Sequence, residues 1–501
     1  MLIRPERDDL RLIAFYVGKV IYGIGLLLLI PLVYALVLAE WNDVTALAVG
    51  ASLAIIIGRL TEVRLYTNHA LDWSHGMVTV ALAWLLGPVF LAIPLYLTDH
   101  YAGFTDAFFD AMSGLTTSGL ALIQDLDHLS DAMQVLRHLS HFAGGQGIII
   151  VVLTVFASSA AQVGTLYVGE GRDDRIVPNV IRTARFIYLV ALTYLVVGTT
   201  ALFLAGLHAG LRPGRALFHG VNIFMAAFDT GGFAPYSSSI GYYHSAVFEA
   251  VVIVLMVAGG LSFGMHFQLW RGRNAEAARD FELRTLATTF SAITLLVLIG
   301  LGRSGAYTDA GALFRKGVFT AVSAHTGTGF AVNASTAFAN DWGLIAPAMI
   351  VIAMALGAMA SSTAGGMKAI RVGIAAKAVL RDIRRVIAPD SAVVLASYHQ
   401  KFRRIVTDAQ VRAAITILVL YLLLYLGGAL VAVYYGYSFD KAMFESTSAG
   451  ANVGLSIGVL SPDNPLPLKW TFILQMYLGR LEFMAAFALI GYGVAMVRGK
   501  L

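Results

Sequence analysis

Long apolar runs, broken by short polar stretches, alternate along almost the whole chain. A helix needs about 20 mainly apolar residues to cross a bilayer. The pattern therefore predicts ten crossings with loose boundaries, and an even number puts both ends of the chain on one side of the membrane. The predicted crossings lie near residues 13–38, 44–57, 76–98, 133–157, 186–206, 245–270, 286–301, 343–360, 411–435 and 469–497.

Four polar stretches between these runs share one register. Setting four glycines in one column aligns their neighbours without gaps. Small residues stand six positions before each glycine, and a leucine or a phenylalanine directly follows it. A unit repeated in this way fixes the architecture. The aligned glycines are Gly119, Gly232, Gly329 and Gly454.

The four stretches predict an ion filter. Irregular backbone at membrane depth is tolerated only where protein buries it or where it lines a wet cavity. A filter for a dehydrated cation needs carbonyl oxygens that replace the hydration shell, and glycine lets the backbone approach the ion closely. The alternative is four glycine loops that only turn the chain. The candidate filter residues, whose ligands are mainly backbone oxygens, are Thr117, Ser118, Gly119, Thr230, Gly231, Gly232, Gly327, Thr328, Gly329, Asn452, Val453 and Gly454.

The predicted fold class is an all-α polytopic membrane protein with four helix–pore-loop–helix repeats around a pseudo-fourfold pore. An N-terminal two-helix hairpin lies outside the repeats. In chain order, we expect this accessory hairpin at 1–75 and pore units 1, 2 and 3 at 76–170, 171–275 and 276–375. A basic cytoplasmic connection and pore unit 4 follow at 376–501.

Composition and charge agree with a membrane protein. Hydrophobic residues make up 58% of the chain and charged residues 13%, which argues against a soluble enzyme. The absence of cysteine excludes disulfides, thiolate metal sites and cysteine nucleophiles. Basic residues gather in the loops of one side, which places those loops and both termini in the cytoplasm. The net charge of +5 therefore follows topology and does not indicate nucleic-acid binding. The basic connection at 376–407 is either topology alone or a docking face for a cytoplasmic partner.

Two features of the apolar runs suggest a gate. Residues 356–368 are rich in small and polar side chains, which makes a poor helix and a flexible loop that could block the pore. Arg480 interrupts the last run, and an intramembrane arginine is a functional candidate by default. It either faces the pore or pairs internally. The candidate gating residues are Arg480, Ser362, Thr363, Gly365, Gly366 and Lys368.

Other polar residues leave alternatives open. Asp229 either adds negative charge near the mouth of the filter or caps a turn, and the glycines at 144–147 allow either close helix packing or a bend. Arg137 and His138 are expected nearer a membrane surface. Ser262 lies in a Gly-x-Ser-x-Gly match, but a nucleophile elbow requires a strand–turn–helix context, and an apolar helix is expected here.

Several motifs together resemble the Trk/Ktr superfamily of microbial potassium transporters, with the Trk-type membrane subunit the nearest type. They are Leu-Thr-Thr-Ser-Gly at 115–119, Thr-Gly-Thr-Gly-Phe at 326–330, Gly-Gly-Gln-Gly-Ile-Ile at 144–149, Ser-Thr-Ala-Gly-Gly-Met-Lys at 362–368 and Gly-Arg-Leu-Glu at 479–482. The resemblance implies four units around one K⁺-selective pore, a homodimer and a bacterial cytoplasmic (inner) membrane. It also implies a nucleotide-binding regulatory subunit on the cytoplasmic side. K⁺ is then the transported ion, and any nucleotide belongs to the partner.

The first functional hypothesis is potassium uptake through a gated pore, driven by a membrane potential worth about 2.3 kcal/mol per charge per 100 mV. The alternative is a symporter that couples K⁺ to H⁺ or Na⁺, for which Glu249 and Glu482 are candidate carboxylates. A third hypothesis, from another class, is an intramembrane enzyme. We expect no enzyme, because the sequence offers no convincing catalytic set.

Overall fold

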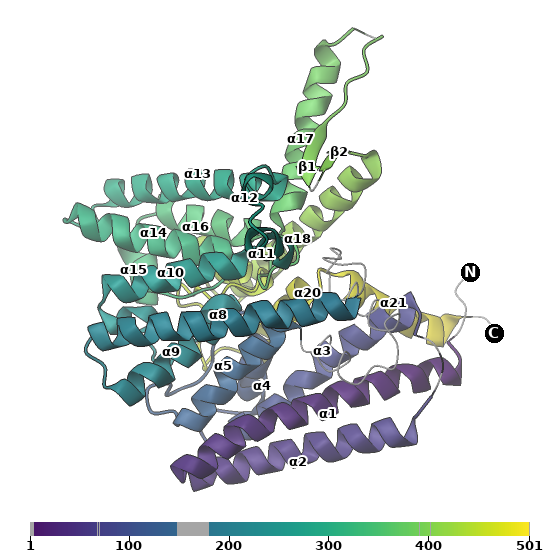
Figure 1. The fold of residues 1–501 in the computed structure, drawn as a ribbon, viewed down its shortest axis with the longest axis vertical. Coiled ribbons are helices and arrows are strands. Elements are labelled where there is room, and N and C mark those ends of the chain that lie inside the picture. The colour runs from purple at the N-terminus through teal and green to yellow at the C-terminus, as the bar shows by residue number, and fades with distance from the viewer. Residues whose placement is uncertain are drawn as a thin grey trace.

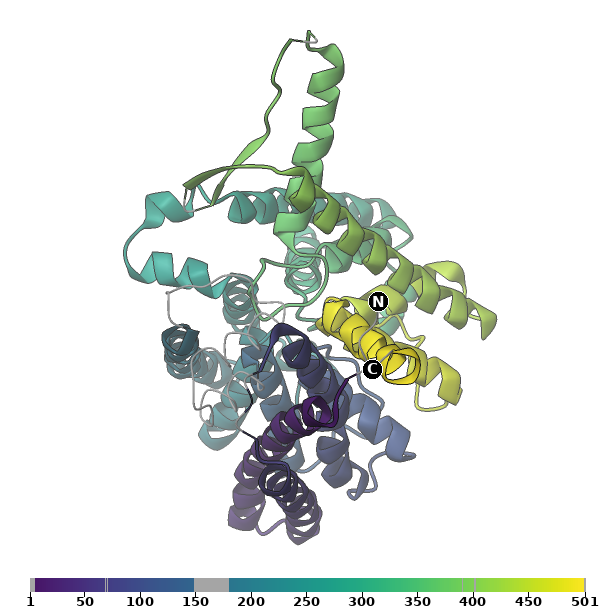
Figure 2. The ribbon, with the colours of Figure 1, turned by 90° about the vertical axis from the view of Figure 1, so that its right-hand side faces the viewer.

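The computed structural model of the chain describes residues 5–67, 69, 71–147, 180–389, 391–400 and 402–499. The described part is helical except for loops and one short hairpin of two strands (Figure 1). The predicted fold class is confirmed. Helices α1 and α21 place the two chain ends at the same end of the molecule (Figures 1 and 2).

Two long helices form the predicted N-terminal hairpin, α1 (Arg7–Leu38) and α2 (Trp41–Arg64). They lie side by side at one edge of the molecule (Figure 1). Glycines hold their contact: a Cβ atom on Gly58 would overlap the backbone of Tyr22, and one on Gly25 would overlap Ile55. Such close contact between backbones is what small residues provide in membrane helix pairs.

Each repeat then consists of a long helix, a short helix that ends at a glycine loop, and a second helix. Repeat 1 contains α3 (Trp73–Tyr96), α4 (Phe104–Leu115) and α5 (Asp131–Gln146). Repeat 2 contains α8 (Val180–His208), α9 (Pro213–Phe228) and α10 (Ala246–Gly260). Repeat 3 contains α13 (Phe281–Ser304), α14 (Ala310–Thr326) and α16 (Ile345–Leu356). Repeat 4 contains α18 (Asp408–Tyr434), α19 (Phe439–Gly450) and α20 (Leu466–Arg480).

Fewer helices span by length alone than the apolar runs predicted. Among the described residues, six helices are long and apolar enough to cross a membrane, or up to eight if each bent pair counts as one crossing. Helix α16 is apolar but has only 12 residues. Part of the predicted crossing at 133–157 lies outside the described residues. The predicted boundary between units 1 and 2, at 170/171, also lies outside them.

Two predicted crossings are not straight helices. The run at 245–270 bends by 105° between α10 and α11 (Phe263–Trp270), and the run at 469–497 bends by 107° between α20 and α21 (Met484–Arg498). At the first bend, Ser262 caps the new helix by accepting a hydrogen bond from the Met265 amide. At the second, Glu482 and Phe483 have φ angles of 49° and 70°, which no α-helix accommodates. The prediction of single helices was wrong here, because hydropathy does not register backbone breaks.

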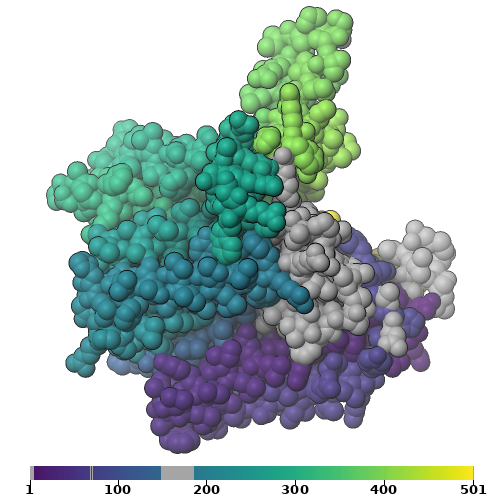
Figure 3. Space-filling model, viewed as in Figure 1, coloured from purple at the N-terminus to yellow at the C-terminus, as the bar shows by residue number. Residues whose placement is uncertain are grey.

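The basic connection carries structure of its own. Helix α17 (Ala369–Ile387) and the antiparallel strands β1 (Ser397–Gln400) and β2 (Phe402–Ile405) project from the helical body (Figures 2 and 3). The hairpin is a small departure from an all-helical chain. Three further short helices lie between the longer ones: η1 (Ser239–Tyr243), α12 (Asn274–Ala277) and α15 (Ser335–Asn340).

Candidate ion filter and the loop behind it

The four short helices end in the same way. Two residues before each aligned glycine, the backbone takes a left-handed conformation, with φ between 50° and 73°. The next amide then bonds back to a carbonyl five residues earlier, which is a Schellman-type helix end. These bonds join Ser118 N to Ser113 O (2.8 Å), Gly231 N to Ala226 O (2.8 Å), Thr328 N to Ser323 O (2.9 Å) and Val453 N to Ser448 O (2.9 Å).

The aligned glycines close the four loops into a ring. We call the segments 117–119, 230–232, 327–329 and 452–454 glycine loops 1 to 4. Each aligned glycine has a positive φ and packs against the carbonyl oxygen of the residue before the glycine of the next loop, so that a Cβ atom would overlap that oxygen. The contacts run in order around the ring: Gly119 on Gly231, Gly232 on Thr328, Gly329 on Val453, and Gly454 on Ser118.

One vestibule opens onto this ring. A cavity of about 660 Å³ is lined by all four aligned glycines and by residues that follow them, including Ala234 and Ser456. The residues directly before the four glycines do not line this cavity. The structure therefore brings the twelve predicted filter residues together, and the vestibule opens at their aligned glycines.

Glycines in the second helices let those helices pack against the ends of the short helices. A Cβ atom on Gly144 would overlap the carbonyl of Leu115. Gly259 and Gly479 have the corresponding contacts in repeats 2 and 4, with Phe228 and Gly450. For Gly144, the structure thus favours close packing over a bend.

Asp229 does not lie at the mouth of the ring. Its side chain is buried, and the Gln146 amide donates a hydrogen bond of 2.5 Å to its carboxylate from α5. Asn452 makes a similar link on the opposite side of loop 1, since its amide donates to the Ser118 hydroxyl and to the Met476 carbonyl, both at 2.8 Å. Both polar residues hold glycine loops to their neighbours.

The segment 357–368 lies across the ring on the side opposite the vestibule. The Thr363 hydroxyl is 3.1 Å from the Thr230 hydroxyl of loop 2 and 3.1 Å from the Phe228 carbonyl. Gly365 packs on Asn452 of loop 4, where a Cβ atom would lie 2.8 Å from the Asn452 Cβ. The Cβ atom of Ala364 lies 3.5 Å from where a Cβ on Gly327 of loop 3 would be.

Arg480 joins this segment to loop 1. Its guanidinium donates to the Thr363 carbonyl (2.7 Å), the Gly144 carbonyl (2.7 Å) and the Thr117 hydroxyl (3.2 Å). It also lies 5.4 Å from the centre of the Trp84 ring. With Arg480, the 357–368 segment reaches all four glycine loops.

Other side chains hold the ends of the 357–368 segment. Lys368 is buried and donates to the Ala364 carbonyl, and the Ser362 hydroxyl donates to the Met359 carbonyl at 2.6 Å. Glu282 of α13 accepts from the amides of Ala360 (2.5 Å) and Ile370 (3.3 Å). The sequence analysis did not find Glu282, because a glutamate at the start of a membrane helix looks like an ordinary surface residue.

Two buried carboxylates were also missed. Asp110 accepts from the Leu122 amide at 2.6 Å, and Glu445 accepts from the Ile457 amide at 3.0 Å. Each stands nine positions before its aligned glycine, and each acceptor bond reaches the residue three positions after that glycine. The repeat alignment contained this signal, but only in repeats 1 and 4, since Ile223 and Thr320 occupy the other two positions.

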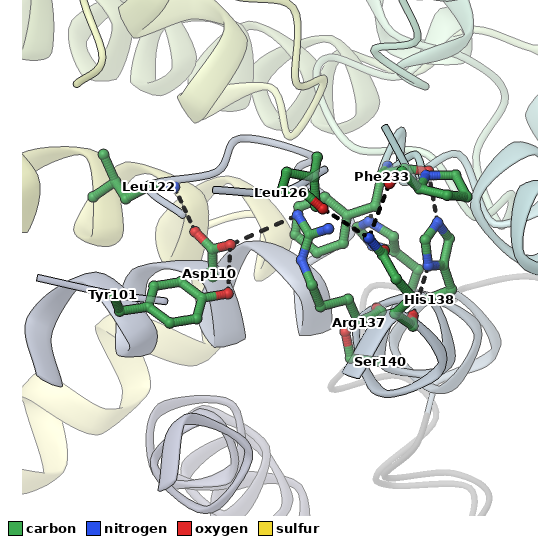
Figure 4. Close-up of polar contacts among 11 residues, drawn as sticks. Tyr101, Asp110, Leu122, Leu126, Arg137, His138, Ser140 and Phe233 are labelled. Carbon is green, nitrogen blue, oxygen red and sulfur yellow. Dashed lines mark hydrogen bonds and ion pairs between the residues drawn. The ribbon is translucent and has the colours of Figure 1, made fainter. Parts of the chain in front are cut away.

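Arg137 and His138 lie in the interior of the protein, and their expected position nearer a membrane surface stays a prediction. Both are buried, with Arg137 only 2% exposed. The guanidinium of Arg137 lies 3.7 Å from Asp110 and 4.1 Å from the centre of the Phe233 ring (Figure 4). The polar side of α5 packs behind the glycine loops, and in the sequence such a side resembles a solvated face.

The carboxylates proposed for coupled transport are ion-paired. Glu249 lies 3.3 Å from Arg315, and Glu482 pairs with Arg371 of α17. The hydroxyl of Ser262, the candidate nucleophile, caps α11. Its Gly-x-Ser-x-Gly motif lies at a bend between two helices and not between a strand and a helix.

Comparison with known proteins identifies the family. A family model described as the cation transport protein TrkH matches residues 46–490. An uncharacterised cation transporter of Methanocaldococcus jannaschii is 29% identical to this chain, and the alignment covers 97% of each protein. The Trk system potassium uptake protein TrkH of Halomonas elongata is 28% identical over 95% of this chain and 97% of its own. The protein of that name from Escherichia coli is 27% identical over 81% of this chain and 83% of its own.

A solved structure has the same fold. The crystal structure of the potassium transporter TrkH from Vibrio parahaemolyticus matches with a TM-score of 0.83 at 24% identity, over 96% of this chain and 98% of the other. The family model spans most of the sequence, and the helical repeats agree with it. The chain therefore belongs to the TrkH family of cation transport proteins.

Proposed function

We propose that this chain takes up K⁺ across the cytoplasmic membrane through a gated, K⁺-selective filter, with the membrane potential as the driving force. Relatives named potassium uptake proteins align with more than four fifths of its length. The observation that carries the proposal is the closed ring, in which each aligned glycine packs against a carbonyl of the next loop. Only a backbone without side chains at these four positions permits that closure.

The twelve residues of the glycine loops form the proposed filter, and their backbone carbonyls are the proposed ligands. Carbonyl oxygens can replace the hydration shell of K⁺. The four short helices end at the ring, and a helix C-terminus carries a partial negative charge of roughly half an elementary charge. Four such ends directed at one ring favour a cation there and disfavour an anion.

The 357–368 segment and Arg480 form the proposed gate. Since the segment and Arg480 together reach every glycine loop from the side opposite the vestibule, an ion that leaves the filter meets them next. Opening requires the segment to move and its bonds with Thr230 and Arg480 to break. Ser362, Gly365, Gly366 and Lys368 belong to this moving unit.

The proposal extends to topology and partners. We place the chain in a bacterial inner membrane as a homodimer, with both termini and the α17 projection in the cytoplasm and the vestibule outside. A cytoplasmic, nucleotide-binding regulatory subunit of the Trk/Ktr type is the proposed partner, and the basic projection is where it would approach. The division into the hairpin 1–75 and four units also stays a prediction.

Coupled symport is the second candidate. Both carboxylates that suggested it are paired with arginines, which makes proton exchange at these sites harder. The intramembrane enzyme has less support, because the chain belongs to a transporter family and Ser262 serves as a helix cap.

Reversal potentials in proteoliposomes test the proposal. Purified chain is reconstituted, and the K⁺ current is measured while the H⁺ and Na⁺ gradients are varied at a fixed K⁺ gradient. For a passive pore, the current reverses at the K⁺ equilibrium potential under every condition. A reversal potential that moves with the H⁺ or Na⁺ gradient would replace the pore by a symporter, and K⁺-independent currents would refute both.

A further inference from the structure

The residue directly after the aligned glycine of loop 2 is held by the neighbouring repeat. The Phe233 amide donates to Nε2 of His141 at 3.3 Å, and its carbonyl oxygen lies 3.1 Å from Nε2 of His138. Its ring lies 4.1 Å from the centre of the His141 ring and 4.1 Å from the Arg137 guanidinium. All three partners come from α5 of repeat 1, and Figure 4 shows Arg137 and His138 beside Phe233.

His141 is the central member of this group. It is completely buried, and its Nδ1 lies 2.9 Å from the carbonyl oxygen of Gly114, in the last turn of α4. Because a carbonyl only accepts, Nδ1 carries the proton and donates. Nε2 of the same neutral ring is then the acceptor for the Phe233 amide. One imidazole therefore links the helix end of repeat 1 to the loop of repeat 2.

The flat face of the same imidazole also fixes the backbone of loop 2. A Cβ atom on Gly231 would overlap the His141 ring, so the glycine and the imidazole are in direct contact. The carbonyl of Gly231 is in turn the one against which Gly119 of loop 1 packs. A shift of His141 would therefore move a proposed ligand carbonyl.

The surroundings of His141 favour the neutral ring that this bonding requires. Burial disfavours a charged His141 ring, and the nearby titratable groups include Arg137 and His138 on its own helix and Arg480 on α20. All are cations when protonated, and Asp110 of α4 lies against Arg137. A positive charge on His141 would be repelled by these arginines, and the added proton would remove the acceptor that the Phe233 amide uses.

We infer that His141 is a positioning residue for selectivity: as a hydrogen-bonded bridge between Gly114 O and Phe233 N, it sets the place of loop 2 relative to loop 1. This inference rests on the proposed filter. The inferred role of His141 requires a hydrogen-bond donor, Nδ1, and an acceptor, Nε2, on the same ring. An apolar side chain of the same volume would not position loop 2.

The test compares three variants with the intact chain in proteoliposomes, by the ratio of K⁺ to Na⁺ flux. His141→Gln keeps a donor and an acceptor on a long side chain, so the ratio should stay within about twofold of the wild-type value. His141→Leu keeps the volume without hydrogen bonds, and His141→Asn keeps the polar groups but is too short to reach both partners. In both, the ratio should fall about tenfold, a change equivalent to 1.4 kcal/mol. His219→Leu is the matched control, because His219 is a buried histidine whose Nδ1 bonds to the Tyr243 hydroxyl and not to a glycine loop.

Several outcomes would overturn the inference. A wild-type ratio of K⁺ to Na⁺ flux in His141→Leu or His141→Asn would show that selectivity does not depend on the His141 bridge. A ratio that falls as far in His141→Gln as in the other two variants would show that selectivity does not depend on the hydrogen bonds. If His141→Leu fails to fold, the comparison of Asn with Gln decides. A wild-type chain that does not prefer K⁺ would instead refute the proposed function, which separates that failure from this one.

Discussion

Removing the Arg480 side chain should open the proposed gate. In Arg480→Ala, the Thr363 carbonyl loses a charged donor at 2.7 Å, and the Thr117 hydroxyl loses one at 3.2 Å. The segment 357–368 is then held to repeat 1 less tightly, while its bonds to loop 2 remain. The closed state should lose stability relative to the open state.

The size of the effect follows from the bond to Thr363. A hydrogen bond to a charged group contributes about 1.5–3 kcal/mol. If the bond exists only in the closed state, its loss shifts the closed-to-open equilibrium by about 10- to 150-fold. The bond to Gly144 joins Arg480 to α5 and not to the segment, so it does not enter this estimate.

The assay is K⁺ flux into proteoliposomes that contain purified chain without a cytoplasmic partner. Basal flux should rise at least tenfold. The K⁺ to Na⁺ ratio should stay unchanged, because Arg480 bonds to the side chain of Thr117, whereas the proposed ligands are backbone carbonyls. Arg480→Lys is the control, since it keeps the positive charge but lacks the planar fork that reaches several acceptors. Unchanged or lower flux in a folded Arg480→Ala chain would refute the reasoning, and a Lys variant that behaves as wild type would assign the effect to charge alone.

Three further predictions follow from the contacts described above. In Gly365→Ala, the new methyl group would meet the Ala451 carbonyl and displace the segment, so basal K⁺ flux should rise; lower flux would contradict a blocking role. Asp110→Leu leaves buried Arg137 without its carboxylate and should lower the unfolding free energy by about 3–5 kcal/mol, measured by thermal denaturation in detergent, whereas an unchanged melting temperature would contradict the pairing. Ser262→Ala removes a helix cap, so it should lower the unfolding free energy by about 1 kcal/mol and leave K⁺ flux unchanged. Loss of flux in a folded variant would instead support a catalytic role of Ser262.

The parts of the molecule that could be predicted are those with a local signature. The four aligned glycines could be recognised in the sequence because close backbone contacts around the ring leave no room for a side chain. Glycine therefore occurs at the same position of all four repeats. The weak helix at 356–368 was visible for a similar reason, since its small and polar residues do not favour a helix in an apolar run. The structure finds it non-helical from Gly357 to Lys368.

The parts that could not be predicted depend on partners distant in the sequence. Arg137 is buried against Phe233 and Asp110, which belong to other segments, and nothing near Arg137 in the sequence indicates these contacts. At the bend after Arg480, Glu482 pairs with Arg371, which lies 111 residues away in the sequence. Hydropathy describes each run separately, so it gives the number of apolar runs but not where a helix breaks inside one.

The most direct test of the account is the selectivity of ion flux, because the central claim is that the four-glycine ring selects K⁺. Fluxes of K⁺, Rb⁺ and Na⁺ are measured for wild type, for Gly329→Ser and for Gly427→Ser. Gly427 lies in α18, and a Cβ there meets nothing within 4 Å, whereas Gly329 has φ 85° and lies against the Val453 carbonyl. The account predicts that K⁺ and Rb⁺ pass faster than Na⁺ in wild type and Gly427→Ser, and that Gly329→Ser erodes this preference. Equal passage of Na⁺ through the wild-type chain, or an unchanged preference in Gly329→Ser, would contradict it.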